Sequence, residues 1–480
     1  MESLQRTANR GSVSTGPYQI DNSVKLEDDN DEYLTRTNAS GTNRKTFTVS
    51  AWFKQTELAT QLGHITEIWD GGTNGNATRM GVYSDDRLWV DVAGGTGNTG
   101  TQFRSLATLK LRDTSAWYHM VLAVDTTQST EANRMKVWLN GTEVTAWDQH
   151  QIPTEDYECS LESGTTMSWG SYNSTYHGFS GYLAECNYLD GVTATQNDFG
   201  EYDDDTGIWI PKQYTGSYAG QSAYLNFSDS SDLGANSKGD DVNFTLVNIA
   251  AADQATDTPT NNFTTWNPLV LYDAGAYTFP NGATEIKKGA SNGWVTVYGN
   301  MGVNKGKWYA EFEVLTSGEL QMMGQLPLTK IRDSIATQFY LGADANGLGG
   351  SGYYTSGTSG NDTIYYGGGY TSSGVTTSAG DIISVAMDCD NNKVHYAVNG
   401  TYTNSSNPAN NTNGFAMSDD YQFFASSTYT QDKTFKCNFG GYTTDTISSA
   451  ATDANGYGTF EYSPPSGYYS LCTKNLAEYG

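Results

Sequence analysis

Several residue types and patterns are scarce in this chain, and their scarcity limits what the protein can be. Only 26 of the 480 residues are Lys or Arg, against 53 Asp or Glu, which gives a formal net charge of −27. Binding to a phosphate backbone needs clustered cations, so we expect neither nucleic acid nor an anionic membrane surface as a partner. The acidity instead keeps an aromatic-rich surface soluble, with cation binding as the alternative.

Long apolar runs, helical periodicity and closely spaced cysteines are also missing. No run approaches the roughly 20 apolar residues that span a bilayer, and MESLQRTANRGSVSTG has no apolar h-region, so we expect neither membrane insertion nor a secretory signal. No window keeps a 3.6-residue apolar period, so helix is expected to be minor. The cysteines predict buried thiols rather than a disulfide framework or a zinc site; they are Cys159, Cys186, Cys389, Cys437 and Cys472.

Turn-forming and aromatic residues are what the chain has in quantity. It contains 53 Gly, 33 Tyr, 17 Phe and 11 Trp but only 10 Pro, and such a composition indicates short strands joined by many turns. One device occurs twice. Residues 117–144 contain WYHMVLAVDTT and MKVWLNGTEV, and residues 381–402 contain DIISVAMDCDNN and KVHYAVNGTY. Each is a pair of alternating strands whose second member ends at Asn-Gly, a strong hairpin signal. The repeat predicts two all-β domains of related architecture.

We therefore predict five parts along the chain. Residues 1–20 are polar and slightly basic, and form either a disordered terminus or an arm that orders on a partner. Residues 21–212 form a first β-sandwich, residues 213–270 a structured connector packed on it, and residues 271–445 a second β-sandwich. Residues 446–480 form an extended segment, because Pro464 and Pro465 enforce an extended conformation.

Individual strands follow from alternation and turn residues. In TFTVSAWFK, one face carries Phe47, Val49, Ala51 and Phe53, and we expect that face to meet the core. Ten strands are expected in the first sandwich: Ser23–Leu26, Thr46–Lys54, His64–Trp69, Thr78–Tyr83, Arg87–Val92, Thr101–Leu111, Trp117–Asp125, Met135–Leu139, Thr166–Trp169 and Gly181–Tyr188. The strands expected in the second sandwich lie at 306–314, 335–344, 362–370, 381–390, 393–402, 421–429 and 434–441.

Some of these motifs resemble known families. Residues 45–190 resemble a laminin-G/pentraxin-like, concanavalin-type domain through FTVSAWFK, WYHMVLAVD, VWLNGTEV and FSGYLAECNYLDG. Residues 300–440 resemble a SPRY domain through NKGKWYAEFEV, GDIISVAMDCDNNKVHYAVNG and FKCNFGG. Both resemblances imply two-sheet jelly-roll sandwiches in tandem. The segments TDTPTNNFTTWNPL and YSPPSGYYSLCTKNL look like signatures of structural proteins of tailed bacteriophages, which implies a virion protein.

Glucanases of the concanavalin type resemble one another in a Glu-x-Asp-x-x-Glu strand, so paired acids need checking. The nearest matches here are Glu311 with Glu313, and Glu185 with Asp190. Residues i and i+2 of a strand share a face, but both pairs lack the third acid, so we expect solvated strand faces rather than a glycosidase site. The histidines show no triad spacing, and those on strands are expected to be structural: His64, His119 and His395.

Acidic loops raise the question of a calcium ion. Asp388, Asp390 and Asn392 imitate the start of a calcium loop, but Lys393 replaces the needed Gly and Asn399 stands where a bidentate Glu belongs. We therefore predict a turn there. The other acidic clusters, at 28–31, 203–205 and 239–241, are either solvated loops or a Ca²⁺ site; we expect no other cofactor.

The segment most suggestive of binding is residues 347–374, in which tyrosines sit among Gly and Ser. Tyrosine on adaptable loops gives large contact area at low entropic cost, so we predict contact with a surface glycan or a neighbouring subunit. The alternative is a strand pair with an ordinary Tyr-rich face. The candidate ligand-binding residues are Tyr353, Tyr354, Tyr365, Tyr366 and Tyr370.

Taken together, these observations predict a non-enzymatic structural protein of a bacteriophage virion, made in the cytoplasm of the bacterial host. We expect a homo-oligomeric tail or head fibre or appendage that contacts other virion proteins and a host-surface glycan. One alternative is a decoration or cement subunit with a purely architectural role. Another is a polysaccharide depolymerase, against which stands the missing set of acids.

Overall fold

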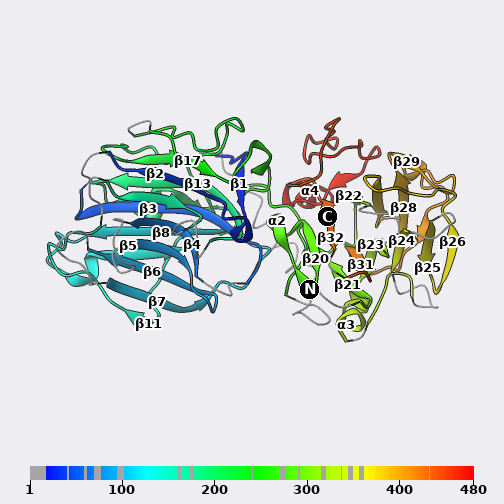
Figure 1. Ribbon diagram of the computed structural model, residues 1–480, viewed down its shortest axis with the longest axis horizontal. Coiled ribbons are helices and arrows are strands. Elements are labelled where there is room, and N and C mark those ends of the chain that lie inside the picture. The colour runs from blue at the N-terminus through cyan, green and yellow to red at the C-terminus, as the bar shows by residue number, and fades with distance from the viewer. Residues whose placement is uncertain are drawn as a thin grey trace. The chain divides into compact units, whose positions relative to one another are not determined.

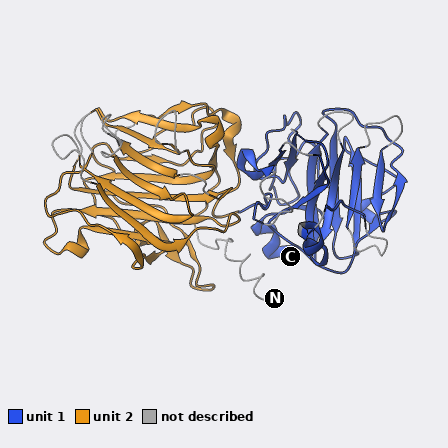
Figure 2. Ribbon diagram, turned by 60° about the horizontal axis from the view of Figure 1, so that its bottom comes forward, with its two compact units in different colours: residues 1–10, 262–480 blue, residues 11–261 orange. Residues whose placement is uncertain are grey.

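The described residues of this computed structural model are almost entirely β structure and fall into two compact units (Figure 2). Unit 2 extends to Asn261, and unit 1 comprises 262–480. Each unit is a β-sandwich, so the expected tandem of two sandwiches is confirmed. The structure describes residues 18–39, 43–58, 62–69, 77–94, 102–160, 164–171, 178–239, 242–269, 277–289, 292–314, 320–336, 338–343, 350–355, 362–431 and 433–480.

Unit 2 is built from two antiparallel sheets (Figure 1). The first sheet runs β10 (Thr142–Glu143), β9 (Met135–Leu139), β8 (Tyr118–Asp125), β3 (Thr46–Gln55), β13 (Gly181–Asp190), β1 (Ser23–Leu26) and β18 (Gln254–Ala255), with β16 (Ala223–Leu225) paired to β13. The second runs β11 (Trp147–His150), β7 (Gln102–Lys110), β6 (Arg87–Ala93), β5 (Ala77–Val82), β4 (Gly63–Trp69), β12 (Thr166–Trp169), β2 (Tyr33–Thr37) and β17 (Thr245–Val247). All ten strands predicted for this region are present.

The two faces of β3 show how the core of unit 2 forms. Phe47, Val49, Ala51 and Phe53 lie in the hydrophobic core between the sheets, as their alternation predicts. The opposite face is also buried, because residues that follow β13 cover it. The hydroxyl of Thr48 on that face donates to the carbonyl of Val192 over 2.9 Å. A small hairpin of β14 (Gly200–Tyr202) and β15 (Trp209–Pro211) belongs to this cover.

The ends of unit 2 differ from the sequence-based division of the chain. Strands β16, β17 and β18 come from the predicted connector, yet they pair with β13, β2 and β1 and so complete both sheets. The predicted N-terminal arm lies outside the described residues up to residue 17. Ile20, its last residue, is buried, and both its N–H and its carbonyl bond the Thr260 hydroxyl.

Unit 1 also contains two sheets. The nine-stranded sheet runs β19 (Tyr277–Thr278), β20 (Glu285–Lys288), β32 (Thr434–Asn438), β22 (Lys307–Glu313), β27 (Ile382–Asp388), β28 (Lys393–Val398) and β29 (Thr401–Tyr402), with β30 (Phe415–Ala416) on β28 and β33 (Tyr469–Ser470) on β22. The six-stranded sheet runs β21 (Val295–Tyr298), β31 (Gln422–Thr428), β23 (Gln321–Pro327), β24 (Ser351–Thr355), β25 (Thr363–Tyr366) and β26 (Gly369–Ser372). A short helix, α2 (Pro280–Ala283), precedes β20.

The strand predictions for unit 1 are wrong at 335–344 and at 362–370, and they omit β23. Residues 362–370 were predicted as one strand, but a turn at Gly367-Gly368 divides them between β25 and β26. Residues 335–344 do not form a strand: helix α3 (Leu328–Ala336) ends there, and the chain then crosses the outer face of the six-stranded sheet. The crossing is fixed by the Thr296 hydroxyl, which donates to the carbonyl of Phe339 over 2.8 Å, and by the Leu341 N–H, which donates to Ser427 Oγ over 3.1 Å. Strand β23 was not predicted, because QMMGQLP has neither alternation nor β-branched residues.

The segment 446–480 is only partly extended. Its last residues form helix α4 (Thr473–Tyr479), which buries Leu476 in the core of unit 1. Before the helix, the chain pairs with the start of the unit: the N–H of Thr264 donates to the carbonyl of Leu471 over 3.0 Å, and the N–H of Thr473 to that of Asn262 over 2.9 Å. Pro464 and Pro465 restrict only their own backbone and that of the residue before them, so they do not prevent a helix that begins at Thr473. Among the described residues, no helix has the length and apolar character required to cross a membrane.

Candidate binding site

The hairpin of β25 and β26 forms the edge of the six-stranded sheet (yellow in Figure 1). Its turn is Gly367-Gly368, and both residues have positive φ, 56° and 75°. A two-residue turn of this hand matches the twist of the flanking strands, and glycine adopts it without strain. The turn sets the register, so Tyr365 lies opposite Tyr370.

This hairpin displays tyrosines on both of its faces. Tyr370 is 68% exposed and Tyr366 is 39% exposed, which makes them two of the few large apolar side chains open to solvent among the described residues. The rings of Tyr365 and Tyr370 stack with their centroids 5.3 Å apart. Tyr366 points to the other side and packs against Phe415, with 5.0 Å between the ring centroids.

Further rings extend the Tyr365–Tyr370 pair across the outer face of the sheet. Tyr354 meets Tyr365 edge to face at 5.5 Å, and Trp294 lies 6.1 Å from Tyr354 and 5.6 Å from Tyr429. Tyr340, on the crossing segment, lies 5.4 Å from Trp294 and 6.0 Å from Tyr365. We call this set the aromatic surface; its members are Trp294, Tyr340, Tyr354, Tyr365, Tyr370 and Tyr429.

The structure separates the five tyrosines that the sequence brings together. Tyr354, Tyr365 and Tyr370 belong to the aromatic surface, and Tyr366 lies on the opposite side of the same hairpin. Tyr353 is fully buried in the core, where its hydroxyl donates to Asp362 Oδ2 over 3.2 Å. Adjacent residues of a strand point to opposite faces, so Tyr353 cannot share a surface with Tyr354. Its inclusion among the ligand-binding candidates is wrong.

Sequence reasoning missed Trp294, Tyr340 and Tyr429. Trp294 and Tyr429 are far in sequence from residues 347–374, and only the pairing of β21, β31 and β23 brings them to the same face. Tyr340 lies shortly before residues 347–374, but it was assigned to a predicted strand and lies instead on the segment that crosses the sheet. Partial burial raises the pKa of Tyr354 and of Tyr365. Both phenols therefore stay neutral at physiological pH, and the surface offers apolar ring faces with hydroxyl donors at their edges.

The acids singled out from the sequence serve the fold. Glu311 is buried and accepts the N–H groups of Glu461 and Tyr462, over 2.9 and 2.8 Å, and thereby holds the C-terminal segment. Its pKa is raised to about 7 by burial. Glu313 instead pairs with Lys436 at 2.8 Å. The expectation that these acids lie on solvated faces is wrong, because Glu311 is covered by 461–462.

Glu185 is buried as well, on the outer face of the first sheet of unit 2. It occupies a bulge in β13 with φ 51°, an uncommon conformation for a non-glycine residue. The hydroxyls of Tyr18 and Tyr224 donate to its two oxygens over 2.8 and 2.7 Å. Burial raises its pKa to about 7. Asp190, its expected partner, accepts the N–H groups of Asn43 and Gln221 instead.

His119 illustrates why a serine beside a histidine is not a nucleophile here. Ser50 Oγ lies 2.9 Å from His119 Nε2, and the Trp209 indole N–H lies 3.0 Å from Nδ1. An indole N–H only donates, so Nδ1 is the acceptor and Nε2 carries the proton. Because Nε2 already carries the ring proton, it cannot take a proton from Ser50, and burial lowers the pKa of His119 to about 3, so the neutral ring is also a weak base.

The other histidines and the acidic loops have equally local contacts. His395 Nδ1 lies 2.6 Å from Ser406 Oγ, and His64 Nδ1 lies 3.3 Å from Glu67 Oε2. Asp388 accepts both the N–H and the side-chain amide of Asn391, which is the predicted turn. Within the described ranges no group of His, Cys, Asp and Glu has the arrangement to hold a metal ion; Asp240 and Asp241 lie outside those ranges.

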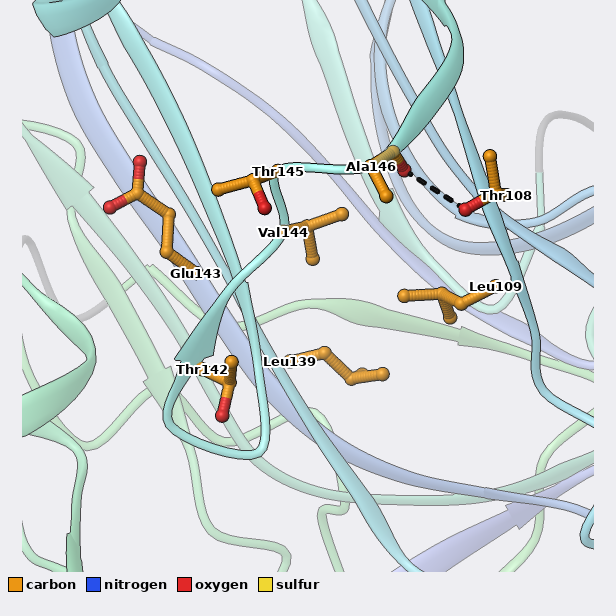
Figure 3. A pocket seen from close by; sticks show the side chains of 8 residues that line it. All are labelled: Thr108, Leu109, Leu139, Thr142, Glu143, Val144, Thr145 and Ala146. Atoms are coloured by element: carbon orange, nitrogen blue, oxygen red, sulfur yellow. Dashed lines mark hydrogen bonds between the residues drawn. The ribbon is translucent and has the colours of Figure 1, made fainter.

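Unit 2 has a hollow of about 270 Å³ between the edges of its two sheets (Figure 3). The Thr108 hydroxyl donates to the carbonyl of Ala146 over 3.4 Å at its rim. Its lining is small and mostly apolar and offers no convergent polar groups: Thr108, Leu109, Leu139, Thr142, Glu143, Val144, Thr145 and Ala146. We therefore assign it no ligand.

Comparison with known proteins bears chiefly on unit 2. Residues 28–197 match the family model of the concanavalin A-like lectin/glucanases superfamily, the laminin G type. This confirms the expected laminin-G/concanavalin-like domain in that region. No curated protein matches the sequence.

Solved structures resemble the units in fold alone. A SAP-like pentraxin from Limulus polyphemus has 14% identity over 48% of this chain and 93% of its own, with a TM-score of 0.30. The SPRY domain of human HERC1 has 14% identity over 36% of this chain and 96% of its own, with a TM-score of 0.26. Domains LG4-5 of the mouse laminin alpha1 chain have 10% identity over 93% of this chain and 88% of theirs, with a TM-score of 0.29.

Proposed function

We propose that this protein is a non-enzymatic, glycan-binding structural protein exposed on a bacteriophage virion, and that the aromatic surface of unit 1 contacts the glycan. The observation that carries the binding role is the stacked pair of Tyr365 and Tyr370 on an edge hairpin, with Tyr370 68% exposed. The faces of a sugar ring present C–H groups, and these fit the negative face of an aromatic ring. Tyrosine also adds a hydroxyl at low entropic cost.

The class of glycan follows from charge. The chain carries a net charge of −27, and the members of the aromatic surface are uncharged. An acidic polysaccharide would meet an unfavourable field, so the preferred ligand is a neutral polysaccharide of the bacterial surface. Hydrolysis is not part of the proposal, because Glu185, Glu311 and Asp190 each accept hydrogen bonds that hold other parts of the fold.

The virion role is supported by the two signature-like segments. They are about 200 residues apart in sequence, yet Asn262 and Thr264 of the first bond Thr473 and Leu471 of the second, over 2.9 and 3.0 Å. The two segments therefore form one structural element of unit 1. We further propose a homo-oligomer that contacts other virion proteins; a purely architectural decoration subunit is the alternative that the binding experiment decides.

The test is binding of the purified chain to an array of neutral and acidic bacterial polysaccharides. Tyr370→Ala and Tyr365→Ala should each weaken binding to neutral glycans by about tenfold or more, as expected of central aromatic contacts. Tyr202→Ala is the matched control, because Tyr202 is an equally displayed tyrosine of unit 2, 51% exposed. Wild-type protein that binds no glycan, or a Tyr370→Ala variant that binds normally, would overturn the binding role.

Particle location needs a separate experiment. Antibodies against the purified chain should label the outside of intact phage particles in electron micrographs. Absence of the protein from purified particles would overturn the virion role while leaving any glycan binding measured on the array intact.

A further inference from the structure

Three ionisable side chains meet in the interior of unit 2, on the outer face of its first sheet. Lys25 on β1 is 1% exposed, and its Nζ lies 2.8 Å from Glu32 Oε2 and 2.8 Å from Asp253 Oδ1. The side chains of Glu32 and Asp253 are 5% and 10% exposed. An amine, a carboxyl carbon that it can attack and a second carboxylate thus share a site that is nearly closed to water.

Backbone structure on both sides places these groups close together. Ser23 pairs with Ala255 and Val24 with Gln254 where β1 meets β18. Lys25 directly follows the paired residues of β1, and Asp253 directly precedes β18 as the last residue of a short 3-10 helix, Ala251–Asp253. The paired strands therefore bring the lysine and the aspartate to the same end of the ladder, where their side chains meet.

The contacts of the aspartate suit acyl chemistry. Its Oδ2 accepts the N–H of Ala250 over 2.8 Å, and a backbone N–H in that position stabilises the negative charge that develops on the oxygen when the carboxyl carbon is attacked. Its Oδ1 faces Lys25. The two oxygens therefore have different surroundings: Oδ2 accepts a backbone N–H, and Oδ1 contacts the amine.

We propose that Lys25 and Asp253 form an intramolecular amide crosslink, with Glu32 as the proton carrier. Glu32 takes a proton from the Lys25 ammonium group, and the neutral amine then attacks Asp253 Cγ. The N–C bond forms, the Cγ–Oδ1 bond breaks, and Oδ1 leaves as water with two of the three ammonium protons, one of them delivered by Glu32. An ammonium ion and a carboxylate give an amide and water, so the step needs no other reactant.

The protonation behaviour of the site agrees with these roles. Burial raises the pKa of the Glu32 carboxyl above its ordinary value, so this group can hold a proton between the two transfers. Burial lowers the pKa of Lys25, but the neighbouring carboxylates outweigh it and leave the pKa raised. The lysine therefore rests as an ammonium ion and depends on Glu32 for its deprotonation.

The consequence is a covalent tie between the first and last strands of unit 2. A link between residues 25 and 253 closes nearly the whole unit into a loop and removes many conformations of its unfolded state. It also joins the two ends at which a pulling force would enter. Such a tie is useful to any protein under mechanical load, and it is independent of the aromatic surface in unit 1.

Mass spectrometry tests the proposal directly on the wild-type chain. The intact mass, measured in a denaturing solvent, should be lower than the sequence mass by one water, and a protease digest should contain one branched peptide joining Lys25 to Asp253. Lys25→Met and Glu32→Gln should restore the full mass. Lys54→Met is the matched control, because Lys54 forms an equally buried pair with Asp257 at 2.7 Å, and this variant should keep the deficit.

Two results would overturn the proposal. One is a folded wild-type chain that has its full sequence mass, which would make Lys25, Glu32 and Asp253 a buried ion cluster only. The other is a deficit that the peptide map places elsewhere, for example at a dehydrated Asp or at Lys54. The wild-type map decides the question even if a variant fails to fold.

Discussion

Replacing Glu185 by Gln should make the protein more stable above neutral pH, contrary to the usual effect of changing a buried, hydrogen-bonded acid. Burial raises the pKa of Glu185 from 4.5 to about 7, although two tyrosine hydroxyls oppose the shift. Such a shift corresponds to about 3 kcal/mol between the two protonation states. Because the folded-state pKa is raised, the stabilisation is fully present below pH 4.5 and is lost as pH rises through 7.

The magnitude of the difference between variant and wild type therefore depends on pH. At pH 5 the neutral carboxyl and the amide offer Tyr18 and Tyr224 similar hydrogen bonds, so the two proteins should unfold with nearly equal free energy. At pH 8.5 the wild type keeps the Glu185 carboxylate buried and charged, with two tyrosine hydroxyls rather than a cation as its partners. The free energy of unfolding of Glu185→Gln should therefore be higher than that of the wild type by about 2–3 kcal/mol. Urea unfolding at a series of pH values measures this difference.

Glu311→Gln is the comparison that isolates the cause. Glu311 has a similarly raised pKa of about 7, but its two oxygens accept the N–H groups of Glu461 and Tyr462. The side-chain NH₂ of the glutamine in this variant would face one of these two N–H groups, so one backbone donor would lose its acceptor. The variant should therefore be less stable at every pH, by about 1–3 kcal/mol. A Glu185→Gln variant that loses the same free energy at pH 5 and pH 8.5 would refute the reasoning, because charge burial would then not be the cost.

Two further outcomes follow from the same contacts. Because burial lowers the pKa of His119 to about 3, its contribution to stability is present above pH 6.5 and is lost as pH falls toward 3. The free energy of unfolding of the wild type should therefore fall by about 2 kcal/mol between pH 7 and pH 5 relative to that of His119→Gln. Urea unfolding that shows the same pH dependence for both proteins would contradict this. Tyr353→Phe should cost about 1 kcal/mol through its lost hydrogen bond and leave glycan binding unchanged; weakened binding on the polysaccharide array would restore Tyr353 to the site.

Ten strands of unit 2 could be predicted because their local signals agree with their pairing, whereas β2 and β11 were missed. The Asn-Gly turn after β9 and the alternation in β3 and β8 each point to one structure, and tertiary packing does not override them. The strands that were missed in unit 1 lack such agreement. Strand β23 carries Gly, Pro and two Gln in an unpatterned order, and it is held by neighbours on both sides rather than by its own propensity.

The candidate site could be predicted only where it is local. Tyr365, Tyr366 and Tyr370 lie close together in sequence, so the Tyr-rich composition of residues 347–374 is sufficient to find them, although residues 362–370 were predicted as one strand and not as a hairpin. Trp294 and Tyr429 join the same surface only through the order β21–β31–β23–β24, which no local pattern encodes. Tyr353 was included because the sequence shows that residues 353 and 354 are both tyrosines but not which of them faces the core. That choice follows only from the pairing of β24 with its neighbours.

The acids and histidines show a more general limit. Alternation predicts that the polar face of a strand meets water, but in unit 2 that face is covered by residues after β13 and by the segment before Asn261. Lys25, His119 and Glu185 all lie on it, and each is buried with partners from distant parts of the chain. A polar group buried in this way must be paired, must change its pKa or must react. His119 is paired through Ser50 and Trp209, Glu185 shifts its pKa between two tyrosines, and Lys25, held between two carboxylates, is the one whose surroundings allow a bond to form.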